Sequence, residues 1–320
     1  MIPLIVITGP TACGKTPTAV ALAKKIKGEI VSADSMQIYK GMDIGTAKPT
    51  MAERDGIPHH MLDIEDPKKD FSAAVFQQMA RGAIEDIYSR GKIPILVGGT
   101  GFYIAGVVYE NALTSEEDDN ANSRELIIRE ELMKQAAQKG GGALHNRLKI
   151  VDPQSAVGIH PNNVKRVVRA LAYYEANHKP ISAYKRGRDL RYGTLFIVLN
   201  RDRGSLYETI NRRVEVMINQ GLIQEVEKLL AAGVGDKATA MQALGYKEIV
   251  PYLKGACSLE EAVKAIKQGS RRYAKRQLTW FRHQLDGHWL SMDDKTPEEA
   301  AEVIKELADQ WFIATDQIGG

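Results

Sequence analysis

A glycine-rich motif directly after an apolar run is the feature that most constrains the fold of this chain. Residues 9–16 read Gly-Pro-Thr-Ala-Cys-Gly-Lys-Thr and follow the apolar run Leu4–Thr8, which is short enough for a buried strand. A loop of this kind, between a strand and a helix, turns its backbone N–H groups toward a phosphate, and the helix N-terminus adds partial positive charge. Lys15 is expected to reach the terminal phosphate, and the Thr16 hydroxyl to bind Mg²⁺.

The motif predicts phosphate binding but not a reaction, because kinases, hydrolases and switch proteins all use such loops. Pro17 lacks an N–H, which favours a ligand with fewer phosphates than a nucleoside triphosphate. The apolar run Ile93–Val97 continues into Gly98-Gly99-Thr100 without an acidic residue, and this counts against a motor ATPase or a switch GTPase. The residues expected to surround the phosphates are Gly9, Pro10, Thr11, Ala12, Cys13, Gly14, Lys15 and Thr16.

Short apolar runs alternate with helical patterns through the first 110 residues. Strands are expected at 4–8, 29–32 and 93–97, with helices near 18–25 and 71–87 between them. Strands separated by helices predict a parallel sheet covered on both faces, with ligands at the carboxyl ends of the strands. Three candidate motifs lie at such ends: Gly9–Thr16, Asp34–Tyr39 and Gly98–Gly101.

The character of the chain changes near residue 112, and an apolar run at 195–199 marks a return to the core. Residues 145–191 hold ten basic and three acidic side chains, a strong local excess of positive charge. The fold expected is therefore an α/β, P-loop NTPase-like parallel sheet with a helical insertion domain. Residues 1–112 and 196–320 would form the core with its C-terminal helices, and residues 113–195 the insert. Helical patterns in the C-terminal part cover 206–220, 222–232 and 259–284.

The overall composition indicates where in the cell the protein is expected. The 320-residue chain has no stretch approaching the roughly 20 apolar residues of a membrane span, and its start does not resemble a signal peptide. Its two cysteines, Cys13 and Cys257, indicate neither a zinc site nor a disulfide framework, so a cytoplasmic location is expected. The net charge of +3 is too small to indicate a nucleic-acid partner by itself, and a monomer is the default expectation.

Several further motifs accompany the glycine-rich motif at residues 9–16, called the phosphate loop below. They lie at 34–49, 58–63, 97–101, 159–163, 243–247 and 275–282, and with the loop they span nearly the whole chain. Together they closely resemble the tRNA dimethylallyltransferase (isopentenyltransferase) family. The resemblance implies a P-loop core with a helical insertion domain. It also implies transfer of the dimethylallyl group of dimethylallyl diphosphate to N6 of the adenosine on the 3′ side of the anticodon in tRNA, with Mg²⁺ required.

The resemblance also implies roles for individual residues. Asp34 matches the general base that takes the N6 proton as the new N–C bond forms. Thr100 and Arg213 match residues on the diphosphate, and the fork of donors on an arginine suits that leaving group. The target base would be held just after Asp34, where an amide such as that of Gln37 can pair with an adenine edge.

A base inside an anticodon loop has to leave its stack to reach a pocket, so the protein needs a surface that grips the RNA. Lys165, Arg166 and Arg169 share one predicted helix, and 264–283 carries seven basic and no acidic residue. From charge alone such runs are more often solvated faces. The residues expected to contact tRNA are Asp34, Ser35, Met36, Gln37, Thr100, Arg124, Lys165, Arg166, Arg169, Gln242, Gly245, Tyr246 and Lys247.

Three alternative functions fit the sequence less well. An isopentenyltransferase for free adenine nucleotides needs no basic track, and a small-molecule kinase leaves 34–49 without a role. A non-catalytic RNA-binding protein with a relic loop has no reason to keep Lys15, Thr16, Asp34 and Thr100 together. The adjacent pair His59 and His60 is expected to be structural, since neighbouring side chains diverge and no other ligand is close in sequence.

Overall fold

The chain divides into two compact units. The computed structural model describes residues 1–110, 119–183 and 188–318. The first unit comprises residues 1–110 and 190–320, and the second comprises residues 111–189.

Six parallel strands form one sheet in the described part of the first unit, in the order β3-β2-β4-β1-β5-β6. In the central strands, Ile5 pairs with Ile95 on one side and with Leu195 on the other. The order places the carboxyl ends of β2, β4 and β1 next to one another. The strands are β1 (Pro3–Thr8), β2 (Gly28–Ser32), β3 (His59–His60), β4 (Ile93–Gly98), β5 (Gly193–Asn200) and β6 (His288–Ser291).

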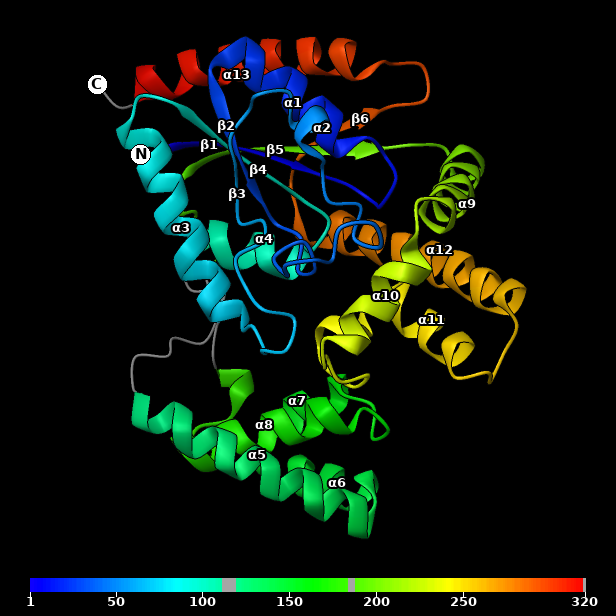
Figure 1. Ribbon diagram of the computed structural model, residues 1–320. Helices are drawn as coiled ribbons and strands as arrows, with labels where there is room; N and C mark the ends of the chain where they lie inside the picture. The colour runs from blue at the N-terminus through cyan, green and yellow to red at the C-terminus, as the bar shows by residue number, and fades with distance from the viewer. Residues whose placement is uncertain (111–118, 184–187, 319–320) are drawn as a thin grey trace. The chain divides into compact units, whose positions relative to one another are not determined.

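Alternate side chains of the central strands enter two different cores, because successive residues of a strand face opposite sides of the sheet. Leu4 and Val6 pack with the helices α3 (Ala73–Ser89) and α4 (Gly101–Val108). Ile5 and Ile7 pack on the other side with α1 (Lys15–Ile26) and α13 (Pro297–Ile318). Figure 1 shows the two pairs of helices on opposite faces of the sheet.

The remaining helices of the first unit pack beside the α3–α4 face, except for the short helix Met51–Arg54, which lies beside α1 (Figure 1). The long helix α12 contacts α4, α9 and α11, and its start at Ser258 is fixed by a capping box with Glu261. The remaining helices are α2 (Met51–Arg54), α9 (Arg203–Asn219), α10 (Leu222–Ala231), α11 (Tyr246–Leu253) and α12 (Leu259–Gln284).

The second unit is helical where it is described and has its own core. Leu132, Leu144, Leu148 and Leu171 are buried together in it. Its helices are α5 (Asp119–Lys139), α6 (Gly141–Val151), α7 (Pro153–Gly158) and α8 (Val164–Asn177). No helix among the residues described in either unit is long and apolar enough to cross a bilayer.

The parallel α/β core confirms the predicted fold class, whereas some element boundaries differ. β5 begins at Gly193, inside the range expected for the insert, because Gly193 and Thr194 pair with β1 although neither is strongly apolar. The helix expected at 71–87 begins at Ala73, where Ser72 caps its first turn. The short edge strands β3 and β6 and the helix α13 were not predicted from the sequence.

Candidate active site

Three loops meet where β1, β2 and β4 end. The Thr8 hydroxyl donates to the carbonyl of Gly98 at 2.9 Å, which joins the ends of β1 and β4. The amide of Ala33 donates to the carbonyl of Val97 at 2.7 Å, which joins β2 to β4. The structure thus brings the three candidate motifs to the same edge of the sheet.

The phosphate loop has backbone geometry that needs small residues. Gly9 has φ +148° and Gly14 has φ +92°, and a Cβ at Gly9 would collide with the carbonyl of Leu199. Cys13 is fully buried in the core beneath the loop, so this position contributes its backbone and packing. Lys15 Nζ lies within the loop and donates to the carbonyls of Gly9 at 3.0 Å and Pro10 at 2.7 Å.

Two cations and one carboxylate influence one another at the strand ends. Burial lowers the pKa of Lys15; Cys13 and Asp34 oppose this effect, and Arg213 adds to it. Burial also lowers the pKa of Arg213, again opposed by Asp34 and Cys13. Arg213 on α9 therefore joins the phosphate loop although nearly 200 residues separate them in sequence. Two cations near the loop give this edge of the sheet a positive charge that favours an anion.

Asp34 lies just beyond β2 and is half-buried. Its Oδ1 accepts from the amide of Met36 at 2.9 Å, which folds the backbone after the strand. The amide of Ser35 donates to Thr100 Oγ1 at 3.3 Å. Asp34, Ser35, Met36 and Thr100 are therefore together, and Thr100 also stands at the N-terminus of α4.

Two tyrosines in this site, Tyr273 and Tyr103, were not identified from the sequence. Burial, with the charge of Asp34, raises the pKa of Tyr273 to about 12, and Tyr273 is hydrogen-bonded to Thr100. Burial, with Tyr39 and Asp34, raises the pKa of Tyr103 to about 12. Only the structure reveals that Tyr273 lies close to Asp34.

The amide of Gln37 is already satisfied within the protein. Its Oε1 accepts from the Ser32 hydroxyl at 3.0 Å, and its Nε2 donates to the carbonyls of Thr46 and Ala47 at 3.2 Å each. Pairing of this amide with an adenine edge, as expected from the sequence, conflicts with these bonds. The observed role of Gln37 is to close the loop that follows Asp34.

A second set of contacts fixes the far end of the same loop. Glu225 on α10 accepts from the amides of Asp43, Ile44 and Gly45 at 2.8–3.1 Å. The Tyr246 hydroxyl donates to the same carboxylate at 2.5 Å. Its partners lie in the motifs 34–49 and 243–247, but Glu225 itself lies in none of the motifs recognised in the sequence, so it was missed.

A buried lysine holds the middle of that loop. Lys48 Nζ donates to the carbonyl of Tyr39 at 2.8 Å and to the carboxylates of Asp43 and Asp63 at 2.6 Å each. Its side chain is 3% exposed, so the charge is stable only because both carboxylates and the carbonyl surround it.

The residues expected to contact tRNA near α11 differ in exposure. Gln242 and Lys247 are exposed, whereas Gly245 is buried. The Tyr246 side chain has no exposed surface and packs against Gly45, so in this structure the ring supports the loop after β2. Burial and the Glu225 charge raise the pKa of Tyr246, which keeps its hydroxyl a donor.

In the second unit, Lys165 and Arg166 are exposed on α8, and Arg169 is half-buried. Val167, Val168 and Leu171 on the opposite side of α8 are buried, so the basic residues form one face of an amphipathic helix. Arg124 is exposed on α5.

The basic run on α12 is partly neutralised by a neighbouring helix. Lys267 pairs with Glu215 at 2.7 Å, and Arg271 donates to Asn211 at 2.6 Å, both on α9. Arg272, Lys275 and Arg276 are exposed on this helix.

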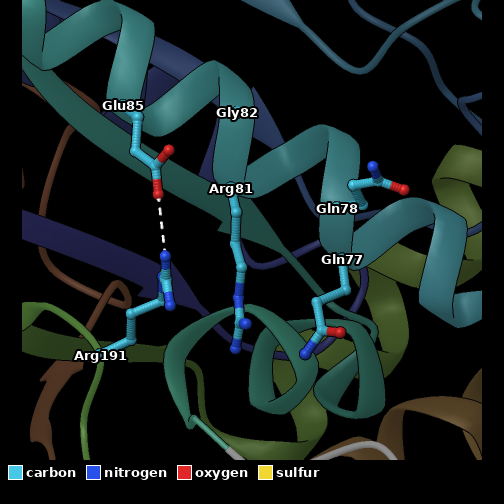
Figure 2. A pocket seen from close by; sticks show the side chains of 6 residues that line it. All are labelled: Gln77, Gln78, Arg81, Gly82, Glu85 and Arg191. Atoms are coloured by element: carbon cyan, nitrogen blue, oxygen red, sulfur yellow. Dashed lines mark hydrogen bonds and ion pairs between the residues drawn. The ribbon is translucent and has the colours of Figure 1, made fainter. Parts of the chain in front are cut away.

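A polar pocket on α3 lies outside this set of residues, as Figure 2 shows. Arg81 and Gln77 donate to the carbonyl of Gly106, and Arg81 donates to that of Tyr109, so they satisfy the end of α4. Arg191 pairs with Glu85 at 3.2 Å. These side chains are occupied with structural bonds, and the strand ends remain the better candidate site.

His59 and His60 lie on the edge strand β3. His59 Nδ1 is 2.8 Å from the carbonyl of Ile57, and His60 Nε2 is 2.8 Å from the Glu29 carboxylate. Among the described residues no group of three or more His, Cys, Asp or Glu side chains is arranged to hold a metal. Both rings are hydrogen-bonded within this edge of the sheet.

Comparison with known proteins agrees with this arrangement. The family model described as IPP transferase matches residues 37–284. The tRNA dimethylallyltransferase of Geobacillus thermodenitrificans is 51% identical over 306 residues, covering 95% of this chain and 94% of the relative. That of Caldanaerobacter subterraneus is 51% identical over 311 residues, covering 95% and 97%.

Solved structures give the same result. The tRNA isopentenylpyrophosphate transferase of Bacillus halodurans has a TM-score of 0.73 and 41% identity, with all of both chains covered. A eukaryotic dimethylallyltransferase acting on tRNA has a TM-score of 0.84 and 31% identity, covering 98% of this chain and 80% of that one. With a family model matched over most of its length and relatives at half identity, this chain belongs to the IPP transferase family.

Proposed function

We propose that this chain transfers a dimethylallyl group from dimethylallyl diphosphate to N6 of the adenosine 3′ to the anticodon in tRNA, releasing diphosphate. The observation that carries the proposal is the convergence of Lys15, Arg213 and Asp34 at adjoining strand ends. The site pairs a place for an anionic leaving group with a carboxylate able to take a proton. The identity of donor and acceptor is supported by the names of the relatives.

Departure of diphosphate is the first chemical requirement. Negative charge grows on the bridging oxygen as the C–O bond breaks, and donors already in place stabilise it without reorganisation. The loop amides, Lys15 and Arg213 supply such donors, and the half-buried setting strengthens each interaction. Thr100 would complete the set from the end of β4.

A magnesium ion fits the residues at this loop. The Thr16 hydroxyl is half-buried at the first turn of α1 and offers the oxygen ligand that Mg²⁺ prefers. The described residues contain no larger acidic cluster, which suits an ion held mostly by phosphate and water. When bound, Mg²⁺ would supply further charge neutralisation to the diphosphate.

Asp34 would act as the general base. The lone pair of adenine N6 is delocalised, so removal of a proton as the N–C bond forms raises the rate by about 10²–10⁴-fold. The bond from the Met36 amide to Oδ1 orients this carboxylate, which leaves Oδ2 to accept the proton. Tyr273 and Tyr103 would screen the site from water.

Recognition of tRNA would use the exposed basic residues of α8, together with Gln242 and Lys247. A phosphate contact releases a counterion, so its loss reduces the salt dependence of binding. Lys165→Ala is expected to lower the slope of log affinity against log salt by about 1. The matched control is Lys139→Ala, at an exposed position at the end of α5. An unchanged slope in Lys165→Ala would show that Lys165 does not contact the tRNA phosphates.

The direct test of function is incubation with Mg²⁺, labelled dimethylallyl diphosphate and either unmodified tRNA or AMP. Label in tRNA alone supports the proposal. Label in AMP alone would reassign the chain to the enzymes that modify free nucleotides, and label in neither would contradict prenyl transfer.

A further inference from the structure

Gln277 of α12 connects the phosphate loop to the end of β4. Its side chain is almost fully buried. Oε1 accepts from the amide of Thr11 at 2.9 Å, and Nε2 donates to the carbonyl of Gly99 at 2.9 Å. One side chain therefore joins two segments from which it is separated by 266 and 178 residues.

The fit around this side chain is tight. A Cβ at Gly99 would collide with the Gln277 amide, and a Cβ at Gly101 would collide with the Trp280 ring one turn further along α12. The glycines that follow β4, Gly99 and Gly101, are thus needed for α12 to approach. Tyr273, one turn before Gln277, is hydrogen-bonded to both Gln277 and Thr100.

The Thr11 bond changes which donors the loop can offer to an anion. Pro10 and Pro17 have no N–H. The N–H of Thr11 points to Gln277 rather than into the loop. The backbone donors left for a ligand run from Ala12 to Thr16.

We propose that Gln277 is a specificity-determining residue: by taking the Thr11 amide at one end of the loop, it limits the loop to a diphosphate and disfavours a triphosphate. This inference rests on the proposed function, because it explains why a loop of nucleotide-binding type accepts a prenyl diphosphate. A triphosphate needs more donors than a diphosphate, and an unmatched phosphate oxygen in a half-buried site is costly. Two prolines and one glutamine remove three donors from this loop and its first helical turn.

The test is direct binding of inorganic diphosphate and inorganic triphosphate, measured by calorimetry with Mg²⁺ on the full chain. Wild-type protein is expected to bind diphosphate more tightly. Gln277→Met keeps the length of the side chain but frees the Thr11 amide. It is expected to shift the ratio of the two dissociation constants by about tenfold toward triphosphate, the effect of one hydrogen bond to a charged group.

Gln268→Met, an exposed position on the same helix, is the matched control and should keep the wild-type ratio. Gln277→Asn retains an amide that is one carbon too short to span both partners. It should shift the ratio in the same direction by a smaller factor, which protects the test if the methionine variant does not fold.

Equal weakening of both anions, with the ratio kept, would assign Gln277 to packing alone and overturn this inference. Prenyl transfer to tRNA would then still stand. If the wild-type chain binds no diphosphate at all, both this inference and the proposed function are overturned.

Discussion

The phosphate loop and the loop that follows β2 lie at the same edge of the sheet but are held differently. In the phosphate loop, glycine geometry and the bonds of Lys15 to Gly9 and Pro10 all lie within one short segment. The loop from Asp34 to Pro49 depends on Glu225, about 180 residues further along the chain.

The two loops therefore keep their conformations for different reasons. A loop held mostly within its own segment keeps its shape once its strand and helix are formed, although the Thr11 amide of this loop also bonds to Gln277 on α12. A loop held by a distant carboxylate keeps its shape only while α10 is packed in place, so its geometry depends on the whole first unit. Changes in the first loop should therefore affect ligand binding directly, and changes behind the second should affect turnover.

The largest effect is expected for Lys15→Met, which removes the cation inside the phosphate loop. Charge developing on the leaving diphosphate would lose a cationic donor, and single-turnover transfer of label to tRNA should fall by about 10³-fold. Lys24→Met, in an exposed pair with Asp55, is the control and should change little. If Lys15→Met transfers label at a rate within tenfold of wild type, the phosphate loop does not stabilise the leaving diphosphate.

Asp34→Asn should have the next largest effect. Asparagine still accepts from the Met36 amide, so the loop keeps its turn while the base is lost. Transfer should fall by about 10²-fold or more, with tRNA affinity within about twofold of wild type. Asp55→Asn is the exposed control. A matching loss of tRNA affinity would make Asp34 a structural residue instead.

The same difference explains how far the sequence could predict this molecule. The phosphate loop, the parallel core and the convergence of three strand ends follow from local signals: glycine spacing, apolar runs and the geometry of parallel sheets. Their prediction needed no knowledge of distant contacts. Arg213 was assigned only through the resemblance, because an arginine on a helix carries no signal of its own.

Residues that act across long sequence separation could not be predicted in this way. Glu225, Gln277 and Tyr273 sit on amphipathic helices where their spacing indicates only packing. Tyr246 and Gln37 lie in motifs singled out from the sequence, but their side chains bond to other parts of the protein. A motif locates a site without stating which of its side chains face the ligand.

Glu225→Gln tests the loop that follows β2, which depends on a contact from a distant part of the chain. The neutral amide replaces a carboxylate that accepts from three backbone amides and one hydroxyl, so the loop after Asp34 should loosen. We expect kcat to fall by about tenfold and the melting temperature to fall, with the affinity for inorganic diphosphate unchanged. Glu227→Gln, exposed on the same helix, is the control. Weaker diphosphate binding would show that the two loops are one unit.

The smallest effect on activity is expected at the opposite end of β2, where Glu29 serves neither loop. Hydrogen bonds from Arg90, at 2.6 and 2.8 Å, are the main reason that the pKa of Glu29 is lowered to about 2, with His60 assisting. A carboxylate with a lowered pKa stabilises the fold above its unfolded value of 4.5, and this stabilisation is lost as the pH falls toward 2.

Glu29→Gln should therefore be less stable than wild type at pH 7, and the gap in unfolding free energy should narrow as the pH falls from about 5 to about 3. Transfer to tRNA at pH 7 and a temperature well below unfolding should be unchanged, because both loops keep their own contacts. Denaturant unfolding at several pH values measures the gap. If the stability difference does not depend on pH, the Arg90 bonds are not its cause. If Glu29→Gln also loses activity, the loop after β2 depends on contacts at the start of β2 as well.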